Sequence, residues 1–187
     1  AIERIKELVL HVPLSVQSEM TACTAVLALS EDLKPQLLDM GICEVLLPLT
    51  DSPSIEVQGN SAAALGNLSS KADDYAPFNA VWDKPAGGIH GYLVRFLESD
   101  DTTFQHIAVW TLIQLLESGN AELEQHIRDS PHLLALVRQL QNRGDADDEH
   151  DENDAGDSQA DTTPEKEIAA LSRRTEEILF ESSRADS

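Results

Sequence analysis

The chain has 187 residues and a net charge of −21 at pH 7, with 41% hydrophobic but only 4% aromatic residues. A core with few aromatic residues must be built from Leu, Ile, Val and Ala, a mixture that favours helices over strands. The negative charge argues against direct binding to nucleic acid or to an anionic membrane surface, since both need patches of Lys and Arg. No apolar run approaches the roughly 18 residues of a transmembrane helix.

Apolar residues recur at helical spacing along most of the chain, and Pro and Gly separate the helical runs. Pro13 ends the first run, Gly41 is expected to cap a short helix, and Gly87-Gly88 breaks the chain before another run. Cys23 and Cys43 lie inside apolar runs, where we expect both to be buried thiols. In chain order, the expected helices are 1–12, 17–30, 33–39, 42–49, 54–70, 89–97, 102–118, 120–128, 131–142 and 165–181.

The long helical runs repeat one another. The segment 62–69, AAALGNLS, aligns with 23–30 at an offset of 39 residues and with 109–116 at an offset of 47. Periods of about 40–47 residues are typical of HEAT and armadillo solenoids. Aligning Leu115 with Ile178 gives an offset of 63, which falls to 43 when the 20 residues 145–164 are left out. The last helix is therefore predicted to be the third helix of a terminal repeat; the alternative is a tail helix that packs elsewhere on the solenoid.

A block of acidic residues interrupts this terminal repeat. Residues 145–164 carry nine Asp and Glu and no Lys or Arg, and a block of like charges is expected to stay extended and disordered. An EF-hand is excluded there, because Ala155 and Thr162 stand where two calcium ligands are needed. The predicted units are a partial repeat at 1–30, repeats at 31–71 and 72–118, the first two helices of the terminal repeat at 119–144, a disordered acidic loop at 145–164, and a terminal helix at 165–182.

Four stretches of the chain resemble the C-terminal repeats of the fungal vacuolar armadillo scaffolds. They are SIEVQGNSAAALGNLSSKADDY, GGIHGYLVRFL, TFQHIAVWTLIQLLES, and the IAALSRR that follows the acidic block. The resemblance implies an all-α fold, an armadillo-type right-handed α-solenoid of three-helix repeats. It also implies a non-enzymatic scaffold on the cytosolic face of the vacuole membrane. Such a scaffold serves vacuole inheritance, nucleus–vacuole contacts, vacuole fusion, and autophagy or cytoplasm-to-vacuole delivery.

Membrane attachment in this family resembles dual acylation, by myristate and palmitate, at an N-terminus with Gly and Cys residues. This chain starts with Ala1 inside a periodic apolar pattern, so we expect it to be a piece of a longer protein. Because stable anchoring takes two lipid signals, the anchor is expected in the parent protein and not in these residues.

The resemblance further implies a groove, lined by the third helices, in which an Asn and often a Trp four residues earlier hold partner segments. Asn67 matches the Asn position, and Trp110 matches the Trp position of the next repeat, where Gln114 replaces the Asn. Asn60 lies two turns before Asn67 and shares its face. The predicted protein-binding groove therefore consists of Asn60, Asn67, Trp110 and Gln114. The alternative is that Asn67 bridges neighbouring repeats and Trp110 belongs to the core.

Patterns for catalysis and metal binding are missing from the sequence. The six histidines show no metal-ligand spacing, and no nucleophile elbow, phosphate-binding loop or zinc-protease motif occurs. We therefore expect no enzyme activity, no cofactor and no metal. The leading hypothesis is a scaffold whose partners are extended or helical segments of other proteins. The alternative is a solenoid-capping or self-association module whose ligand groove lies in earlier repeats.

Overall fold

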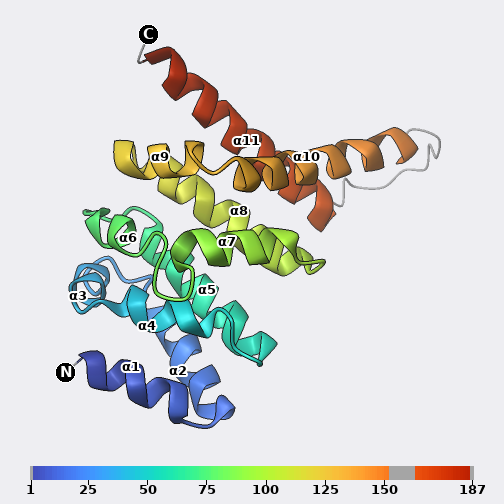
Figure 1. Cartoon of the computed structure of the whole chain (residues 1–187). Coiled ribbons are helices and arrows are strands. Elements are labelled where there is room, and N and C mark those ends of the chain that lie inside the picture. The colour runs from blue at the N-terminus through green and yellow to red at the C-terminus, as the bar shows by residue number, and fades with distance from the viewer. Residues whose placement is uncertain (1, 152–162, 186–187) are drawn as a thin grey trace.

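The computed structural model describes residues 2–151 and 163–185, and most of them are helical (Figure 1). No strand occurs in this part of the chain, so the predicted all-α class is confirmed. The described helices are α1 (Ile2–His11), α2 (Leu14–Leu27), α3 (Lys34–Asp39), α4 (Ile42–Leu49), α5 (Ile55–Ser69), α6 (Ala76–Ala80), α7 (Gly88–Glu98), α8 (Thr102–Glu117), α9 (Ala121–Arg128), α10 (Pro131–Asp151) and α11 (Pro164–Ala185).

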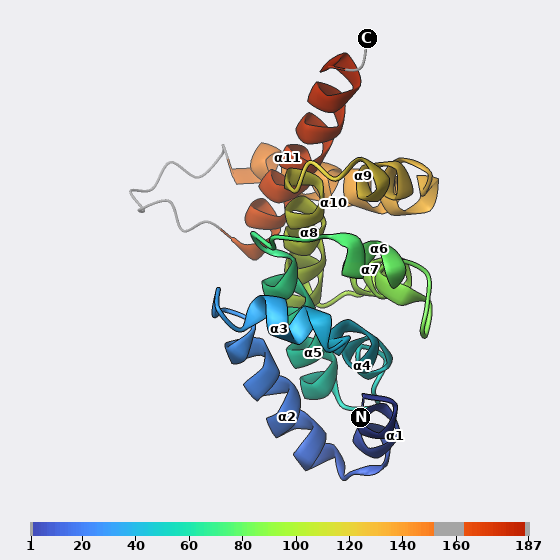
Figure 2. The same ribbon diagram turned by 90° about the vertical axis from the view of Figure 1, so that its left-hand side faces the viewer.

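The helices are arranged in rows along the molecule, as Figure 2 shows. In the first row each long helix packs on the one before it: α5 on α2, α8 on α5, and α11 on α8. In the second row α4 packs on α1, α7 on α4, and α10 on α7. The short helices α3, α6 and α9 each precede a helix of the second row. An array in which each unit contacts mainly its neighbours is a solenoid.

Polar side chains fix where several helices begin. Ser54 Oγ accepts the backbone N–H three residues on at 3.4 Å, and Asp101 Oδ1 accepts those two and three residues on at 2.9 and 3.1 Å. Asn120 Oδ1 does the same for α9 at 3.0 Å. These bonds satisfy N–H groups that have no partner within their own helix. Gly41 follows α3 with a φ of +71°, the left-handed conformation expected of a capping glycine.

One apolar core runs from the end of α2 to α11 and is built mainly from Leu, Ile, Val and Ala. Both α5 and α8 contribute buried leucines to it: Leu65, Leu68, Leu112 and Leu115. Leucines spaced three residues apart share one side of a helix, so the same side of α5 and of α8 faces this core. The opposite side of each helix is left for polar and half-buried residues.

The two cysteines differ, which corrects one expectation. Cys43 is buried as predicted, and burial raises the pKa of its thiol to about 12. Cys23 is exposed, so the prediction that it is buried is wrong. It lies on a side of α2 where Val16 and Leu27 are exposed as well, and this side faces away from α5. An apolar run in a sequence predicts a helix, but not which of its sides meets a neighbour.

The acidic block also differs from its prediction. Helix α10 continues to Asp151, so residues 145–151 are helical where the sequence predicts a disordered loop. Extending a helix costs far less free energy than starting one, which lets the packed part of α10 propagate into polar residues. Residues 152–162 lie outside the described residues. Helix α11 covers the predicted terminal helix and extends beyond it to Ala185.

Candidate protein-binding face

The four predicted binding residues lie on two neighbouring helices of the first row. Asn60 and Asn67 belong to α5, Trp110 and Gln114 belong to α8, and the two helices pack on each other. All four residues are half-buried. We call the surface that these four residues form the third-helix face. The structure therefore brings the two predicted pairs onto adjacent helices of one row.

The helix starts give the register between repeats. The N-caps of α2, α5 and α8 are Pro13, Ser54 and Asp101, which lie 41 and 47 residues apart. Four residues after each N-cap a Gln side chain donates to a backbone carbonyl that precedes the helix; these residues are Gln17, Gln58 and Gln105. The offset of 47 is confirmed, whereas the offset of 39 is wrong and becomes 41. In this register Ala22 and Val26 of α2 are the counterparts of the Trp and Asn positions.

Both asparagines of the third-helix face reach back to α2. Asn60 Nδ2 donates to the carbonyl oxygen of Ser18 at 3.3 Å, and Asn67 Nδ2 donates to that of Ala25 at 2.9 Å. Ala25 lies in the last turn of α2, where carbonyl groups run out of intrahelical donors. The N–H of Leu29, which would reach Ala25 if the helix continued, donates elsewhere. The Asn67 amide thus caps α2 and ties neighbouring repeats together.

Trp110 lies across the contact between α8 and α5, against Gly66. A Cβ atom on Gly66 would lie 2.9 Å from Cζ3 and 3.2 Å from Cε3 of the indole, and 2.8 Å from Oγ1 of Thr111. Non-bonded heavy atoms of this kind prefer separations near 3.5–4.0 Å. The two helices can therefore approach this closely only where α5 has no side chain. Trp110 is half-buried, so its ring is part of this contact and part of the surface.

Gln114 differs from the two asparagines. Its side-chain amide makes no hydrogen bond within the described part of the chain, although the residue is half-buried. A free amide offers an acceptor and two donors, enough to pair with both polar groups of one peptide unit.

Ion pairs lie where α8 meets α11. Arg174 of α11 lies 3.7 Å from Glu117 of α8 and 3.6 Å from Glu177. Along the first row, the third-helix face on α5 and α8 is uncharged, and the charged residues begin at the contact of α8 with α11.

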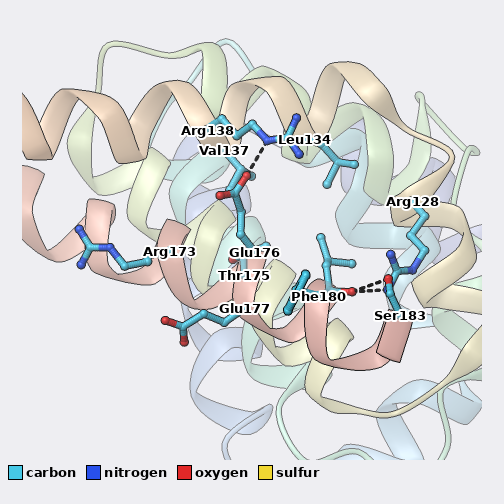
Figure 3. Close-up of a pocket in the computed structure, with 11 residues that line it drawn as sticks. Arg128, Leu134, Val137, Arg138, Arg173, Thr175, Glu176, Glu177, Phe180 and Ser183 are labelled. Atoms are coloured by element: carbon cyan, nitrogen blue, oxygen red, sulfur yellow. Dashed lines mark hydrogen bonds and ion pairs between the residues drawn. The ribbon is translucent and has the colours of Figure 1, made fainter. Parts of the chain in front are cut away.

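A separate cavity of about 580 Å³ lies between α10 and α11, and no sequence pattern predicts it (Figure 3). Figure 3 shows Glu176 of α11 pointing at Arg138 of α10, with Nε and Oε1 2.6 Å apart. Arg128 donates to the carbonyl of Leu179 at 2.5 Å, and Phe180 at the rim is 64% exposed. The cavity depends on how α10 and α11 cross, which the spacing of residues within each helix does not determine.

Two shifted pKa values belong to groups that hold helices together. Burial lowers the pKa of Lys34, whose Nζ donates to the carbonyl of Ser70 just after α5. Hydrogen bonds from Ser182 and Arg128 lower the pKa of Glu124, and the one from Ser182 connects α9 with α11. Across residues 2–151 and 163–185, no three His, Cys, Asp or Glu side chains gather as a metal site requires. None of the helices described there combines the length and the apolarity needed to cross a membrane.

The family model for the Armadillo/beta-catenin-like repeat matches residues 30–70. Vacuolar protein 8 of Aspergillus oryzae is 55% identical over 179 residues, which are 96% of this chain and 29% of that protein. The same protein of Schizosaccharomyces pombe is 59% identical over 157 residues, 84% of this chain and 28% of that protein. That of Saccharomyces cerevisiae is 47% identical over 140 residues, 75% of this chain and 24% of that protein.

A crystal structure of an engineered protein matches the fold with a TM-score of 0.67, over 97% of this chain and 68% of that one. Its sequence is 22% identical, so this likeness concerns the fold alone. The chain spans about 30% of the length of the curated relatives that it matches first. The predicted armadillo-type solenoid is confirmed. The chain belongs to the armadillo-repeat family, and fungal vacuolar protein 8 is the relative that it resembles along most of its length.

Proposed function

We propose that the chain is part of a non-enzymatic scaffold that binds extended or helical segments of other proteins on the third-helix face. The observation that carries this proposal is the half-buried amide of Gln114, which makes no hydrogen bond in the described chain and lies one helical turn from Trp110. A peptide backbone crossing α8 would pair with this amide, and the indole would add apolar contact. The net charge of −21 argues against nucleic acid as the partner.

The scaffold is proposed to act at the cytosolic face of the vacuole. The relatives matched over most of this chain are named vacuolar protein 8, and the chain covers less than a third of each. Membrane attachment is assigned to a lipid anchor, carrying myristate and palmitate, in the parent protein. The processes proposed for the parent protein are vacuole inheritance, nucleus–vacuole contacts, vacuole fusion, and autophagy or cytoplasm-to-vacuole delivery.

The test compares variants of the full-length parent protein in a pull-down from fungal lysate. One variant carries Trp110→Ala and Gln114→Ala, and its matched control carries Gln139→Ala, an exposed amide on α10. A third variant lacks these repeats. Truncating a central aromatic residue of an interface typically costs about 2 kcal/mol or more of binding free energy. Proteins lost on deletion of the repeats should also be lost from the double variant and kept by the control. Full retention by the double variant would exclude the third-helix face as their binding site.

A second candidate is a module for solenoid capping or self-association, and the exposed side of α2 favours it. Val16 and Leu27 are 41% and 40% exposed, whereas their counterparts in α5 in the 41-residue register, Val57 and Leu68, are both 0% exposed. Exposed apolar residues on the surface of a repeat protein promote association. This candidate predicts concentration-dependent dimers of the chain in sedimentation velocity, dispersed by Leu27→Lys. A monomer at all concentrations would refute it and leave the scaffold hypothesis intact.

A further inference from the structure

We propose that Gly66 is the positioning residue of the third-helix face, because the missing side chain at this point of α5 fixes where the indole of Trp110 lies. The consequence for partner binding rests on the proposed function, whereas the position of the indole is a property of the chain itself. The two statements can therefore be tested separately. Gly66 has no side chain with which to hold a partner, so it acts on binding through the position of Trp110.

A glycine at this position has no conformational reason. Gly66 lies inside α5, and it is not among the glycines with a positive φ. Glycine in the middle of a helix is less favourable than alanine, since it loses more backbone freedom on folding. The reason lies instead in the neighbouring helix, where a Cβ atom would come within 2.9 Å of the indole and 2.8 Å of Thr111 Oγ1. The close approach of α8 to α5 thus depends on the absence of a side chain.

The same helix supplies a matched comparison. Gly59 lies seven residues before Gly66, two turns away on the same side of α5. A Cβ atom on Gly59 would lie 3.4 Å from Cε1 of Phe104, which is an ordinary van der Waals separation. Both glycines therefore face aromatic residues of α8, but only a side chain on Gly66 would overlap with the ring. A methyl group on Gly66 has to move the Trp110 ring and Oγ1 of Thr111, whereas one on Gly59 does not have to move Phe104.

Moving the indole leaves the amides of the face in place. Asn67 reaches in the other direction, to the carbonyl of Ala25 on α2. Gln114 lies one turn beyond Trp110 on α8 and makes no hydrogen bond in the described chain. A Gly66→Ala substitution thus displaces the aromatic ring of the third-helix face and retains its hydrogen-bonding groups. This separates the contribution of the ring from that of the amides.

The experiment uses the fluorescence of Trp110. The chain has two tryptophans, and Trp82→Phe leaves Trp110 as the sole reporter while keeping a ring to stack on His126, 5.2 Å away. In this background Gly66→Ala should shift the emission to longer wavelength and raise the acrylamide quenching constant, whereas Gly59→Ala should change neither. Identical emission and quenching in the two variants would overturn the proposal.

Thermal unfolding gives an independent measurement. Because Oγ1 of Thr111 would lie 2.8 Å from the same Cβ atom, this measurement is made with Thr111→Ala in place. In that background Gly66→Ala should lower the unfolding midpoint when Trp110 is present, and by clearly less when Trp110→Ala is combined with it; equal losses with and without Trp110 would overturn the proposal. Proteins captured by the full-length protein through Trp110 should be lost from Gly66→Ala and kept by Gly59→Ala. If the fluorescence shifts but capture is unchanged, the positioning role stands and the proposed binding use of the third-helix face fails.

Discussion

Replacing Asn67 by Ala is expected to loosen the contact between α2 and α5 without unfolding either helix. The side-chain amide donates to the carbonyl of Ala25 at 2.9 Å and supplies the partner that this carbonyl lacks at the end of α2. The substitution removes this donor, and the carbonyl must then find water. Because the pair is half-buried, water has access to the site, and the loss is moderate.

The magnitude follows from the type of bond. An intramolecular hydrogen bond contributes about 0.5–1.5 kcal/mol to stability. Leu65→Ala on the same helix removes a buried side chain and should cost about 2–5 kcal/mol, since it leaves a cavity in the core. At about 1.4 kcal/mol for each factor of ten, Asn67→Ala should raise the local opening of α2 about two- to tenfold. The two substitutions on α5 therefore differ clearly in size.

Amide hydrogen exchange measures this opening helix by helix. In a solenoid each unit contacts mainly its neighbours, so exchange should accelerate in α2 and remain unchanged in α8, which serves as the internal control. Unchanged exchange in α2 would mean that the bond to Ala25 contributes nothing and that Asn67 is available to a ligand. A loss of stability as large as that of Leu65→Ala would instead make Asn67 a core residue. Either result would refute the expectation that the Asn67 bond stabilises the contact between α2 and α5 by a moderate amount.

Three further predictions concern other parts of the chain. Cys23 should react with a thiol reagent in the native protein, whereas Cys43 should react only after denaturation, because burial raises the pKa of its thiol to about 12 and little thiolate forms. Glu124, whose folded pKa is lowered, should stabilise the fold above the ordinary carboxyl pKa and lose this contribution as the pH falls through the lowered value. In urea titrations, Glu124→Gln should therefore be less stable than wild type at neutral pH and equal to it in acid. Leu112→Ala should cost about 2–5 kcal/mol in urea unfolding, because the side chain is fully buried in α8, while Gln139→Ala should cost almost nothing.

The helices of the first row were predictable because their signals are local. Ser54 caps α5, and Asp101 caps α8, each directly before an apolar run at helical spacing. The offset between α2 and α5 was not predictable from the apolar pattern, since runs of Ala and Leu align almost equally well when shifted by a few residues. The correct offset of 41 residues can be read from Pro13 and from the Gln that follows each N-cap by four residues. The sequence alone does not show that these Gln residues are equivalent, because this depends on their hydrogen bonds.

Exposure was harder to predict than helicity. Cys23 and Cys43 lie in similar apolar runs, yet only Cys43 is buried, because burial depends on which helices pack around each side. Gly66 gives a comparable case at the third-helix face. A glycine within a helical run indicates a close approach of some kind. The sequence does not reveal that the approaching group is the indole of Trp110, 44 residues later.

Contacts with the neighbouring helix also explain why Asn67 and Gln114 differ at equivalent positions. Asn67 finds the carbonyl of Ala25 open, because α2 ends at Leu27. In the next repeat the counterpart of Ala25 is Gly66, whose carbonyl already accepts the N–H of Ser70 at 3.2 Å. Gln114 therefore finds the corresponding carbonyl of α5 already occupied, and its amide makes no hydrogen bond in the described chain. The end of the preceding helix, and not the amide itself, decides whether the amide at this position ties two repeats together or stays without a hydrogen bond in the described chain.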